Sequence, residues 1–309
     1  EKAIEKISKL LRVYGRNFDN LKVYIDAIAN INTISYSKKK NMPDVLVNMT
    51  DINQNVFNKA IEQKTDYASL ARFYASEFIK DLSLLNISSI TRLAHVSDYV
   101  KSIVKHISFL IEHKNAYSAN GNIYFDTSTA KDYGIISKQS RQQLNLHRLD
   151  IGPNKKNQED FMLWNCSEDF GFSWSGNFGN GVPWWHIQDS TVVVENFGLH
   201  YDIHGGAKEL AYPHHEAHLA QYKALTGMEN PVKLWMHVGL VLSKGEKMSK
   251  SLGNMILARE LVSKYGQNLL RLYLFSTHYR EEIDYKENDL SSKKILLENK
   301  IDLIFLDIE

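Results

Sequence analysis

The sequence is poor in cysteine. Its 309 residues include a single one, Cys166, which excludes an internal disulfide bond and a cysteine-rich zinc site and is typical of the reducing cytoplasm. No apolar run approaches the roughly 20 residues that span a bilayer, and the first residues, Glu1-Lys2-Ala3-Ile4, lack the pattern of a signal peptide. We therefore expect a cytoplasmic protein with no membrane partner.

An excess of charge of either sign is also missing. Lys and Arg total 37 and Asp and Glu total 36, so the formal net charge is +1. Such a balance argues against a general polyanion binder but not against a local basic patch. Hydrophobic residues make up 43% and charged residues 24% of the chain, as in a globular protein with an ample core. The length corresponds to one large or two modest domains.

The spacing of apolar residues predicts alternating strands and helices, a pattern typical of a mostly parallel α/β sheet. Strands are expected at residues 44–50, 121–126, 199–204 and 233–242, and helices at residues 3–11, 100–111, 214–225 and 257–265. Ser97 or Asp98 is the expected cap of the helix at 100–111. Residues 126–184 are rich in Gly, Asn and Ser, and we interpret them as an insertion rather than a regular layer.

The strongest motif for chemistry is Gly245-Glu246-Lys247-Met248-Ser249-Lys250-Ser251-Leu252-Gly253-Asn254. Its two lysines, flanked by serines and glycines, predict a mobile cationic loop. Such a loop can close over a triphosphate and neutralise the charge that develops as pyrophosphate leaves. The glycines let the backbone approach the phosphates, and the serine hydroxyls can donate hydrogen bonds to them. The alternative interpretation is a solvated loop with ordinary surface lysines.

A second motif combines two glycines with a cluster of histidines. The predicted strand at 199–204 runs into Gly205-Gly206, where backbone can pack against the sugar or base of a nucleotide at the carboxyl end of a parallel strand. Pro213 predicts a helix start. His214 and His218, four residues apart, share a helix face and could bind one metal ion. A pair of hydrogen-bonded structural histidines is the alternative.

Two further histidines lie beside aromatic residues. Trp185 and His186 come just before Asp189, and the three could line a pocket for a small polar substrate or belong to an aromatic core. His237 follows Trp235-Met236 on the strand before the lysine loop. It could lie near the phosphates or be a buried, hydrogen-bonded histidine.

These motifs together resemble the cysteinyl-tRNA synthetases, which are class I aminoacyl-tRNA synthetases. The matching runs are Asn48-Met49-Thr50-Asp51, Asn122-Ile123-Tyr124-Phe125-Asp126, Asp160-Phe161-Met162-Leu163-Trp164, Trp185-His186-Ile187, Asp202-Ile203-His204-Gly205-Gly206, Pro213-His214-His215-Glu216, Trp235-Met236-His237, the lysine loop and His278-Tyr279-Arg280. They follow the family's order and nearly its spacing. The ligase that joins cysteine to an amino-sugar in mycothiol synthesis shares this fold and much of the pattern.

The resemblance implies an α/β fold: a Rossmann-type class I synthetase catalytic domain with a connective insertion and the start of a C-terminal helical region. The halves of the catalytic domain would be residues 1–118 and 183–275, with the insertion at 119–182 and the helical stem at 276–309. It implies an AMP-forming ligase that uses ATP with Mg²⁺ to activate an amino acid, cysteine in the family. The acyl group would pass to a tRNA, or to a small amine as in the mycothiol ligase.

The resemblance also implies roles for residues of this chain. Lys247, Lys250, Ser249 and Ser251 would act on the transferring phosphates. Gly205, Gly206, Glu209, His237 and Met248 would bind the nucleotide, with Glu209 in place of the family's aspartate. Trp185, His186 and Thr50 would bind the amino acid. The family's zinc ligands after the insertion correspond to Asp189, His214 and His218.

Departures from the family pattern keep two questions open. No cysteine occurs near Val13-Tyr14-Gly15, where the family has a zinc ligand, so the remaining nitrogen and oxygen donors could hold Zn²⁺, a harder divalent ion, or no metal. The His-Ile-Gly-His signature is absent, and residues 16–21 occupy that region. Either the protein is a diverged paralogue, weakened or non-catalytic, or the chain lacks residues there. With net charge +1 and no anticodon-binding domain in these residues, we expect weak tRNA binding.

Overall fold

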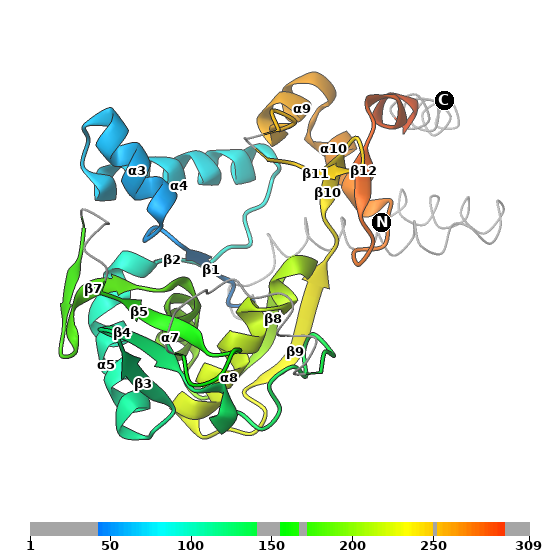
Figure 1. Ribbon diagram of the computed structural model, residues 1–309. Helices are drawn as coiled ribbons and strands as arrows, with labels where there is room; N and C mark the ends of the chain where they lie inside the picture. The colour runs from blue at the N-terminus through cyan, green and yellow to red at the C-terminus, as the bar shows by residue number, and fades with distance from the viewer. Residues whose placement is uncertain (1–42, 141–154, 167–171, 250–251, 294–309) are drawn as a thin grey trace, which may run out of the picture. The chain divides into compact units, whose positions relative to one another are not determined.

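The computed structural model describes residues 43–140, 155–166, 172–249 and 252–293. The chain divides into two compact units, Glu1–Val45 and Leu46–Glu309. Nearly all of the first unit, including the predicted helix at 3–11, lies outside the described residues, so the description concerns the second unit (Figure 1).

Two parallel strand pairs carry the expected α/β pattern. Strand β1 (Leu46–Met49) pairs with β2 (Arg92–His95), and β8 (Tyr201–Ala207) pairs with β9 (Val232–Val238). Helices α3 (Gln54–Gln63) and α4 (Tyr67–Leu84) separate β1 from β2. The parallel direction of these two pairs agrees with the predicted α/β pattern. In the described residues, however, they are separate pairs rather than one sheet, and the largest sheet is antiparallel.

Three helices contribute buried side chains to the largest hydrophobic core, among them Ile103, Ile187 and Ala217. Helix α5 (Val100–Glu112) follows a 3-10 turn (Val96–Tyr99), and α7 (Trp185–Phe197) packs against α8 (His214–Thr226). The predicted caps of α5 are wrong, because its N-cap is Tyr99 and no side chain caps it. Ser97 instead donates from its backbone N (2.9 Å) and its hydroxyl (2.6 Å) to Asp51, which joins the ends of β1 and β2.

Five strands of the described residues between positions 116 and 183 form an antiparallel sheet, which corrects the expectation that the polar segment lacks a regular layer. Its order is β3 (Ala116–Ala119), β4 (Asn122–Phe125), β5 (Phe161–Asn165), β7 (Gly179–Pro183) and β6 (Trp174–Gly176). The glycines that suggested a loop are needed in strands. At Gly181 a Cβ atom would lie 2.3 Å from the carbonyl oxygen of Asn165.

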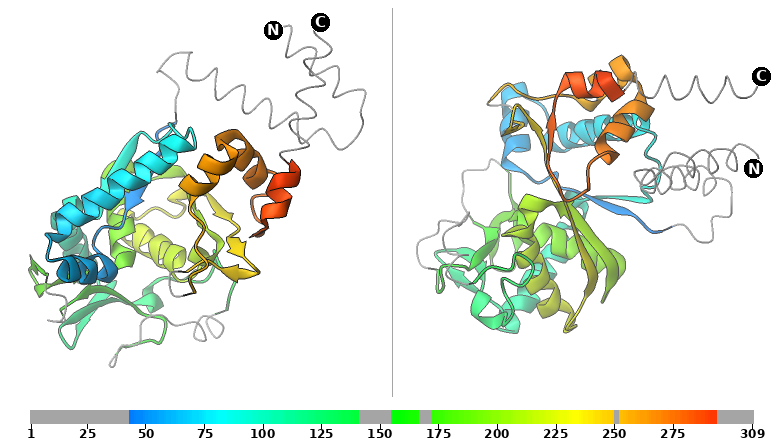
Figure 2. Two further views of the ribbon diagram at one scale, coloured as in Figure 1. Left: turned by 90° about the horizontal axis from the view of Figure 1, so that it is seen from above. Right: turned by 90° about the vertical axis from the view of Figure 1, so that its right-hand side faces the viewer.

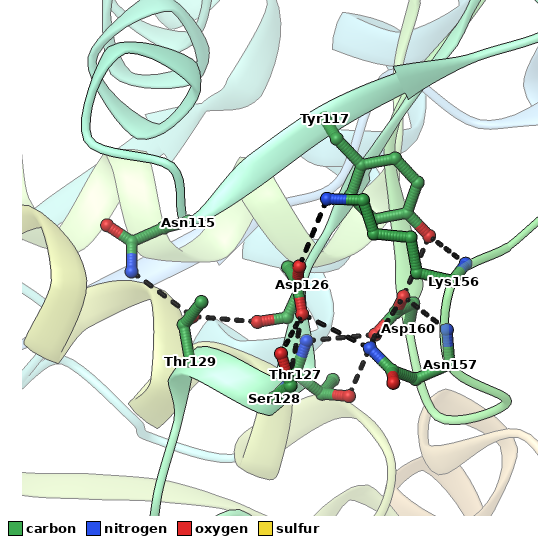
Figure 3. A network of polar contacts seen from close by, with 9 residues as sticks. All are labelled: Asn115, Tyr117, Asp126, Thr127, Ser128, Thr129, Lys156, Asn157 and Asp160. Carbon is green, nitrogen blue, oxygen red and sulfur yellow. Dashed lines mark hydrogen bonds and ion pairs between the residues drawn. The ribbon is translucent and has the colours of Figure 1, made fainter.

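Two buried carboxylates fasten the loop before β5 to this sheet (Figure 3). Asp160 accepts hydrogen bonds from the Tyr117 hydroxyl (2.7 Å), the Thr127 hydroxyl (2.8 Å) and the backbone N of Asn157 (2.9 Å). Asp126 accepts from the amide of Asn157 (3.1 Å). Because these donors satisfy carboxylates that are buried, we interpret the network as structural.

The segment after β9 forms a small sheet and two helices. The predicted strand at 233–242 is interrupted at Gly239, whose backbone N donates to the Tyr279 carbonyl oxygen (2.8 Å) and whose Cβ, if present, would lie 2.1 Å from the Glu281 oxygen. Strand β10 (Val241–Ser243) pairs with β11 (Glu246–Lys247) and β12 (Ile283–Tyr285). Helices α9 (Ala258–Tyr265) and α10 (Gln267–Phe275) lie between them in sequence.

Helix α9 lies beside α4 in both views of Figure 2. Arg259 of α9 contacts both oxygens of Asp81 at 2.9 Å and Glu77 at 3.0 Å. The segment that follows the lysine loop is thereby fastened to the helices between β1 and β2. Within the described residues, no helix is both long and apolar enough to cross a bilayer.

Candidate functional site

Lys247 reaches the end of the diglycine strand. The hairpin β10–β11 turns at Lys244-Gly245, where both φ angles are positive (57° and 74°), as a tight two-residue hairpin turn requires. The Nζ atom of Lys247 lies 2.8 Å and 2.6 Å from the two carboxylate oxygens of Glu209. Glu209 belongs to the 3-10 turn Lys208–Ala211, directly after β8. The Lys247 ammonium is therefore held by a carboxylate three residues after Gly206.

The rest of the lysine loop is organised by Asn254. Its side-chain oxygen accepts from the Ser249 backbone N (2.8 Å), and its amide donates to the Lys247 carbonyl oxygen (3.2 Å). Met248 is half-buried. Lys250 and Ser251, which we predicted to act on the phosphates, lie outside the described residues.

The two glycines of β8 have different surroundings. A Cβ at Gly206 would lie 2.8 Å from His215 Cε1, whereas one at Gly205 would meet only the Met236 carbonyl oxygen at 3.9 Å. His215 Nδ1 lies 2.8 Å from His237 Nε2. Burial lowers the pKa of His215 to about 2 and also lowers the pKa of His237. Both rings are therefore neutral at pH 7, and a role of His237 toward phosphates stays a prediction.

Asp189 of α7 is the centre of a histidine cluster. Its Oδ2 atom lies 3.1 Å from His218 Nδ1, 3.4 Å from His214 Nε2 and 3.6 Å from His204 Nε2. Its Oδ1 atom accepts from the Asn48 amide at 3.3 Å. Burial alone would raise the pKa of Asp189, but His218 and His204 outweigh burial and hold this pKa well below its usual value. The carboxylate is therefore ionised at neutral pH.

The donor atoms around Asp189 fit a divalent cation. Asp189 Oδ2 is buried and accepts no hydrogen bond from the described part of the chain. This oxygen, a ring nitrogen of His204 and a ring nitrogen of His218 lie within 4.8 Å of one another. Carboxylate and imidazole are ligands of Zn²⁺ and of other divalent metals. The predicted ligands Asp189, His214 and His218 are thus together, and His204 joins Asp189 and His218 in the most compact set.

The aromatic ring of Trp185 and the imidazole ring of His186 pack against His214 of this cluster. Trp185 stacks on His214 with ring centroids 4.2 Å apart and an angle of 7° between the planes. His186 Nδ1 lies 3.1 Å from His214 Nδ1, and burial holds the pKa of His186 well below its usual value. Trp185 and His186, predicted to bind an amino acid, therefore contact His214.

A cavity of about 340 Å³ connects the cluster with the diglycine. Thr50, at the end of β1, and Gly205 line it together with Asp189, His204 and His214. The structure thus brings one predicted nucleotide-binding residue, one predicted amino-acid-binding residue and two predicted metal ligands to a single cavity.

Sequence reasoning missed His204 and Tyr201 as parts of this site. The Tyr201 hydroxyl lies 2.5 Å from His204 Nδ1 and 3.0 Å from His218 Nε2. Positions 201 and 204 lie on one strand, and position 218 lies on the helix packed against that strand. The strand periodicity of positions 201 and 204 and the helix periodicity of position 218 each show which residues share a face. Neither shows that side chains from the two elements touch.

Comparisons with known proteins agree with this architecture. A family model described as "tRNA synthetases class I (C) catalytic domain" matches residues 23–295. Cysteine–tRNA ligases are 36% identical over 274 residues in Thermoplasma acidophilum (88% of this chain, 60% of the relative), 37% over 267 in Archaeoglobus fulgidus (85% and 57%) and 40% over 251 in Wigglesworthia glossinidia brevipalpis (80% and 54%). The chain therefore spans a little over half the length of these relatives.

Among solved structures, Mycobacterium tuberculosis methionyl-tRNA synthetase in complex with methionyl-adenylate is similar in fold. Its TM-score is 0.61 at 16% sequence identity, over 81% of this chain and 60% of that one. This likeness concerns the fold alone, whereas the family match covers most of the sequence. The chain belongs to the class I (C) tRNA synthetase catalytic-domain family.

Proposed function

We propose that this chain is the catalytic part of a cytoplasmic, ATP-dependent, AMP-forming ligase that activates an amino acid and transfers it to tRNA. The observation that carries the proposal is the contact of Lys247 with Glu209 beside the diglycine strand. Cysteine is the favoured amino acid because the relatives described above are cysteine–tRNA ligases. Neither an amine acceptor nor a non-catalytic role is favoured by them.

In the proposed reaction, a carboxylate oxygen of the amino acid attacks the α-phosphorus of ATP. The bond from that phosphorus to the bridging oxygen breaks, and pyrophosphate leaves with the electron pair. Lys247 exchanges Glu209 for the β- and γ-phosphates and stabilises the charge that develops on them. Lys250, Ser249, Ser251 and Met248 complete the loop, and Gly205, Gly206, Glu209 and His237 form the nucleotide side of the site.

The amino acid would occupy the cavity between Thr50 and His214, with Trp185 and His186 supporting His214. Asp189, His204 and His218 would hold a divalent ion there, with His214 beside them, and Zn²⁺ would supply a Lewis-acidic position for the amino acid's side chain. Mg²⁺ would accompany ATP. A hydroxyl at the tRNA 3′ end would then attack the acyl carbon of the adenylate, and AMP would leave with the electron pair of the broken carbon–oxygen bond.

The test is amino-acid-dependent exchange between ATP and labelled pyrophosphate, scanned over all twenty amino acids with and without added Zn²⁺. We expect exchange with cysteine above the other nineteen. Exchange with a different amino acid would correct the substrate, and tight ATP binding without exchange for any of the twenty would overturn the ligase proposal in favour of a nucleotide-binding paralogue. Product analysis with tRNA and with a small amine separates the two acceptors.

A further inference from the structure

We propose that the Tyr201 hydroxyl is the positioning group of the Asp189 cluster. When a divalent cation is bound, the Tyr201 oxygen accepts the ring protons of His204 and His218 on the nitrogens that face away from Asp189, so that the bare ring nitrogens face the cation. The inference rests on the metal ligands of the proposed function, but not on adenylation.

The contacts place the two rings between two oxygen atoms. On one edge, the Tyr201 hydroxyl lies 2.5 Å from His204 Nδ1 and 3.0 Å from His218 Nε2. On the other edge, Asp189 Oδ2 lies 3.6 Å from His204 Nε2 and 3.1 Å from His218 Nδ1. Each ring has one nitrogen toward Tyr201 and the other toward the carboxylate, and His218 Nδ1 also lies 3.3 Å from the Ser190 hydroxyl.

The number of protons shared by the Tyr201 hydroxyl and the two imidazole rings determines which ring nitrogens carry no proton. A tyrosine hydroxyl carries one proton, and an ordinary phenol keeps it at neutral pH. That proton can be donated to only one of the two rings. The other ring must donate its own N–H to the Tyr201 oxygen, and a neutral imidazole has only one N–H. At least one nitrogen beside Asp189 therefore carries a lone pair.

A cation placed between this lone pair and the carboxylate would interact favourably with both. Asp189 Oδ2 is buried without a hydrogen bond from the described residues, and two electron-rich atoms repel each other in a site of low dielectric constant. A divalent ion resolves the repulsion, and a proton competes with it for the same position. When the ion is bound, both rings donate to the Tyr201 oxygen.

Tyr201 is held rigidly enough for this role. It belongs to a small core with Val193, Tyr222 and Val232. Its ring stacks on Phe197 at 5.5 Å between centroids and lies 5.6 Å from the ring of Tyr222. The second tyrosine is a matched control, since its hydroxyl donates to the Gly198 carbonyl oxygen at 2.7 Å rather than to the cluster.

The experiment measures the Zn²⁺ affinity of the full chain by competition with a chromophoric chelator, without ATP or amino acid. Tyr201→Phe is expected to weaken Zn²⁺ binding about 10–100-fold, the usual cost of losing a group that orients a metal ligand. Tyr222→Phe is expected to keep the native affinity. Native affinity in Tyr201→Phe, or no Zn²⁺ binding by the native chain, overturns the proposal.

A second measurement does not depend on the variant folding. Long-range ¹H–¹⁵N NMR of the native chain with Zn²⁺ is expected to show the proton of His204 on Nδ1 and that of His218 on Nε2. Either proton on the other nitrogen contradicts the proposal. Because neither measurement uses ATP, a chain that binds Zn²⁺ in this way but catalyses no exchange would refute the ligase function and leave the role of Tyr201 intact.

Discussion

Lys247 and Glu209 are an exposed ion pair, with 60% and 43% of their side chains accessible. Such pairs contribute only about 0–1 kcal/mol to stability because water screens the charges and both side chains lose freedom. A polyphosphate carries several charges where Glu209 carries one. The lysine can therefore leave the carboxylate for a phosphate at small cost, which is what a closing loop needs.

Lys247→Ala is expected to lower ATP–pyrophosphate exchange about 100–1,000-fold, the usual loss when one group that stabilises developing charge is removed. The free energy of unfolding should change little, because the pair is exposed. The matched control is Lys233→Ala, which removes another exposed pair, with Asp202 at 2.7 Å. Equal exchange rates in the two variants would mean that Lys247 does not act on the phosphates.

Several residues of the candidate site are predictable from the sequence. Lys247, Glu209, Asp189, His214 and His218 were all expected near a nucleotide or a metal, and the structure brings the first two together and the last three together. Their motifs are short runs, so their order along the chain was enough to find them.

The missed residues depend on tertiary contacts. The Tyr201 hydroxyl meets His218 across seventeen positions, and His215 meets His237 across twenty-two. A single sequence does not show such pairings, because they arise from how β8, α8 and β9 pack.

At the scale of the element, β8 shows why one glycine of a pair is required. Gly206 faces His215 and Gly205 faces open space apart from one carbonyl oxygen. The sequence predicted both for nucleotide binding. The structure gives Gly206 an additional packing role, because any side chain there would displace the ring that contacts His237.

Gly206→Ala is expected to destabilise the fold by about 1–3 kcal/mol, the range for an overpacked site. Gly205→Ala is expected to stay within about 0.5 kcal/mol of the native chain, as at sites with room for a methyl group. Urea denaturation of both variants measures the difference. A Gly205→Ala variant that is as unstable as Gly206→Ala would show that the two positions are not distinguished by His215.

The sequence predicted the bounds of helices and strands correctly where apolar residues recur at regular helix or strand spacing. The predicted helices at 214–225 and 257–265 agree with α8 and α9, and the strand at 121–126 contains β4. Strands β6 and β7 were missed because glycine, asparagine and serine reduce the apolar signal. Strand β5 is a short apolar run inside a polar segment. At Gly181 the reason is a backbone approach that no local pattern shows.

At the scale of the molecule, the order of motifs was enough to predict the family and a class I synthetase fold. It could not show that β1–β2 and β8–β9 are separate parallel pairs in the described residues or that Arg259 contacts α4 from α9. Both features depend on packing between distant segments. The division into residues 1–118, 119–182, 183–275 and 276–309 stays a prediction.

The buried histidines make the stability of the whole protein depend on pH. Burial lowers the pKa of His204 to about 3, that of His215 to about 2, and that of His186 well below its usual value. The unfolded chain, with histidine pKa values near 6.5, therefore binds more protons below pH 6.5, and stability falls as the pH drops. Glu216, whose pKa burial raises, opposes this trend. Urea denaturation should show a loss of roughly 2–4 kcal/mol between pH 7.5 and pH 5.5.

Two variants identify the source of this dependence. His215→Asn should reduce the pH slope by about one proton, since it removes one group that the folded state keeps neutral. His200→Asn, at an exposed position, should leave the slope unchanged. Stability that is constant or rises from pH 7.5 to pH 5.5 would contradict the account of the buried rings.

The central claim is that Lys247 closes on a nucleotide polyphosphate beside the diglycine strand. A crystal structure of the chain with a non-hydrolysable ATP analogue tests it most directly. We predict that the adenosine contacts Gly205 and Gly206 and that Lys247 Nζ leaves Glu209 to lie about 3 Å from a phosphate oxygen, as in a charge-assisted hydrogen bond. A bound analogue whose phosphates lie elsewhere, with Lys247 still paired to Glu209, would contradict the account.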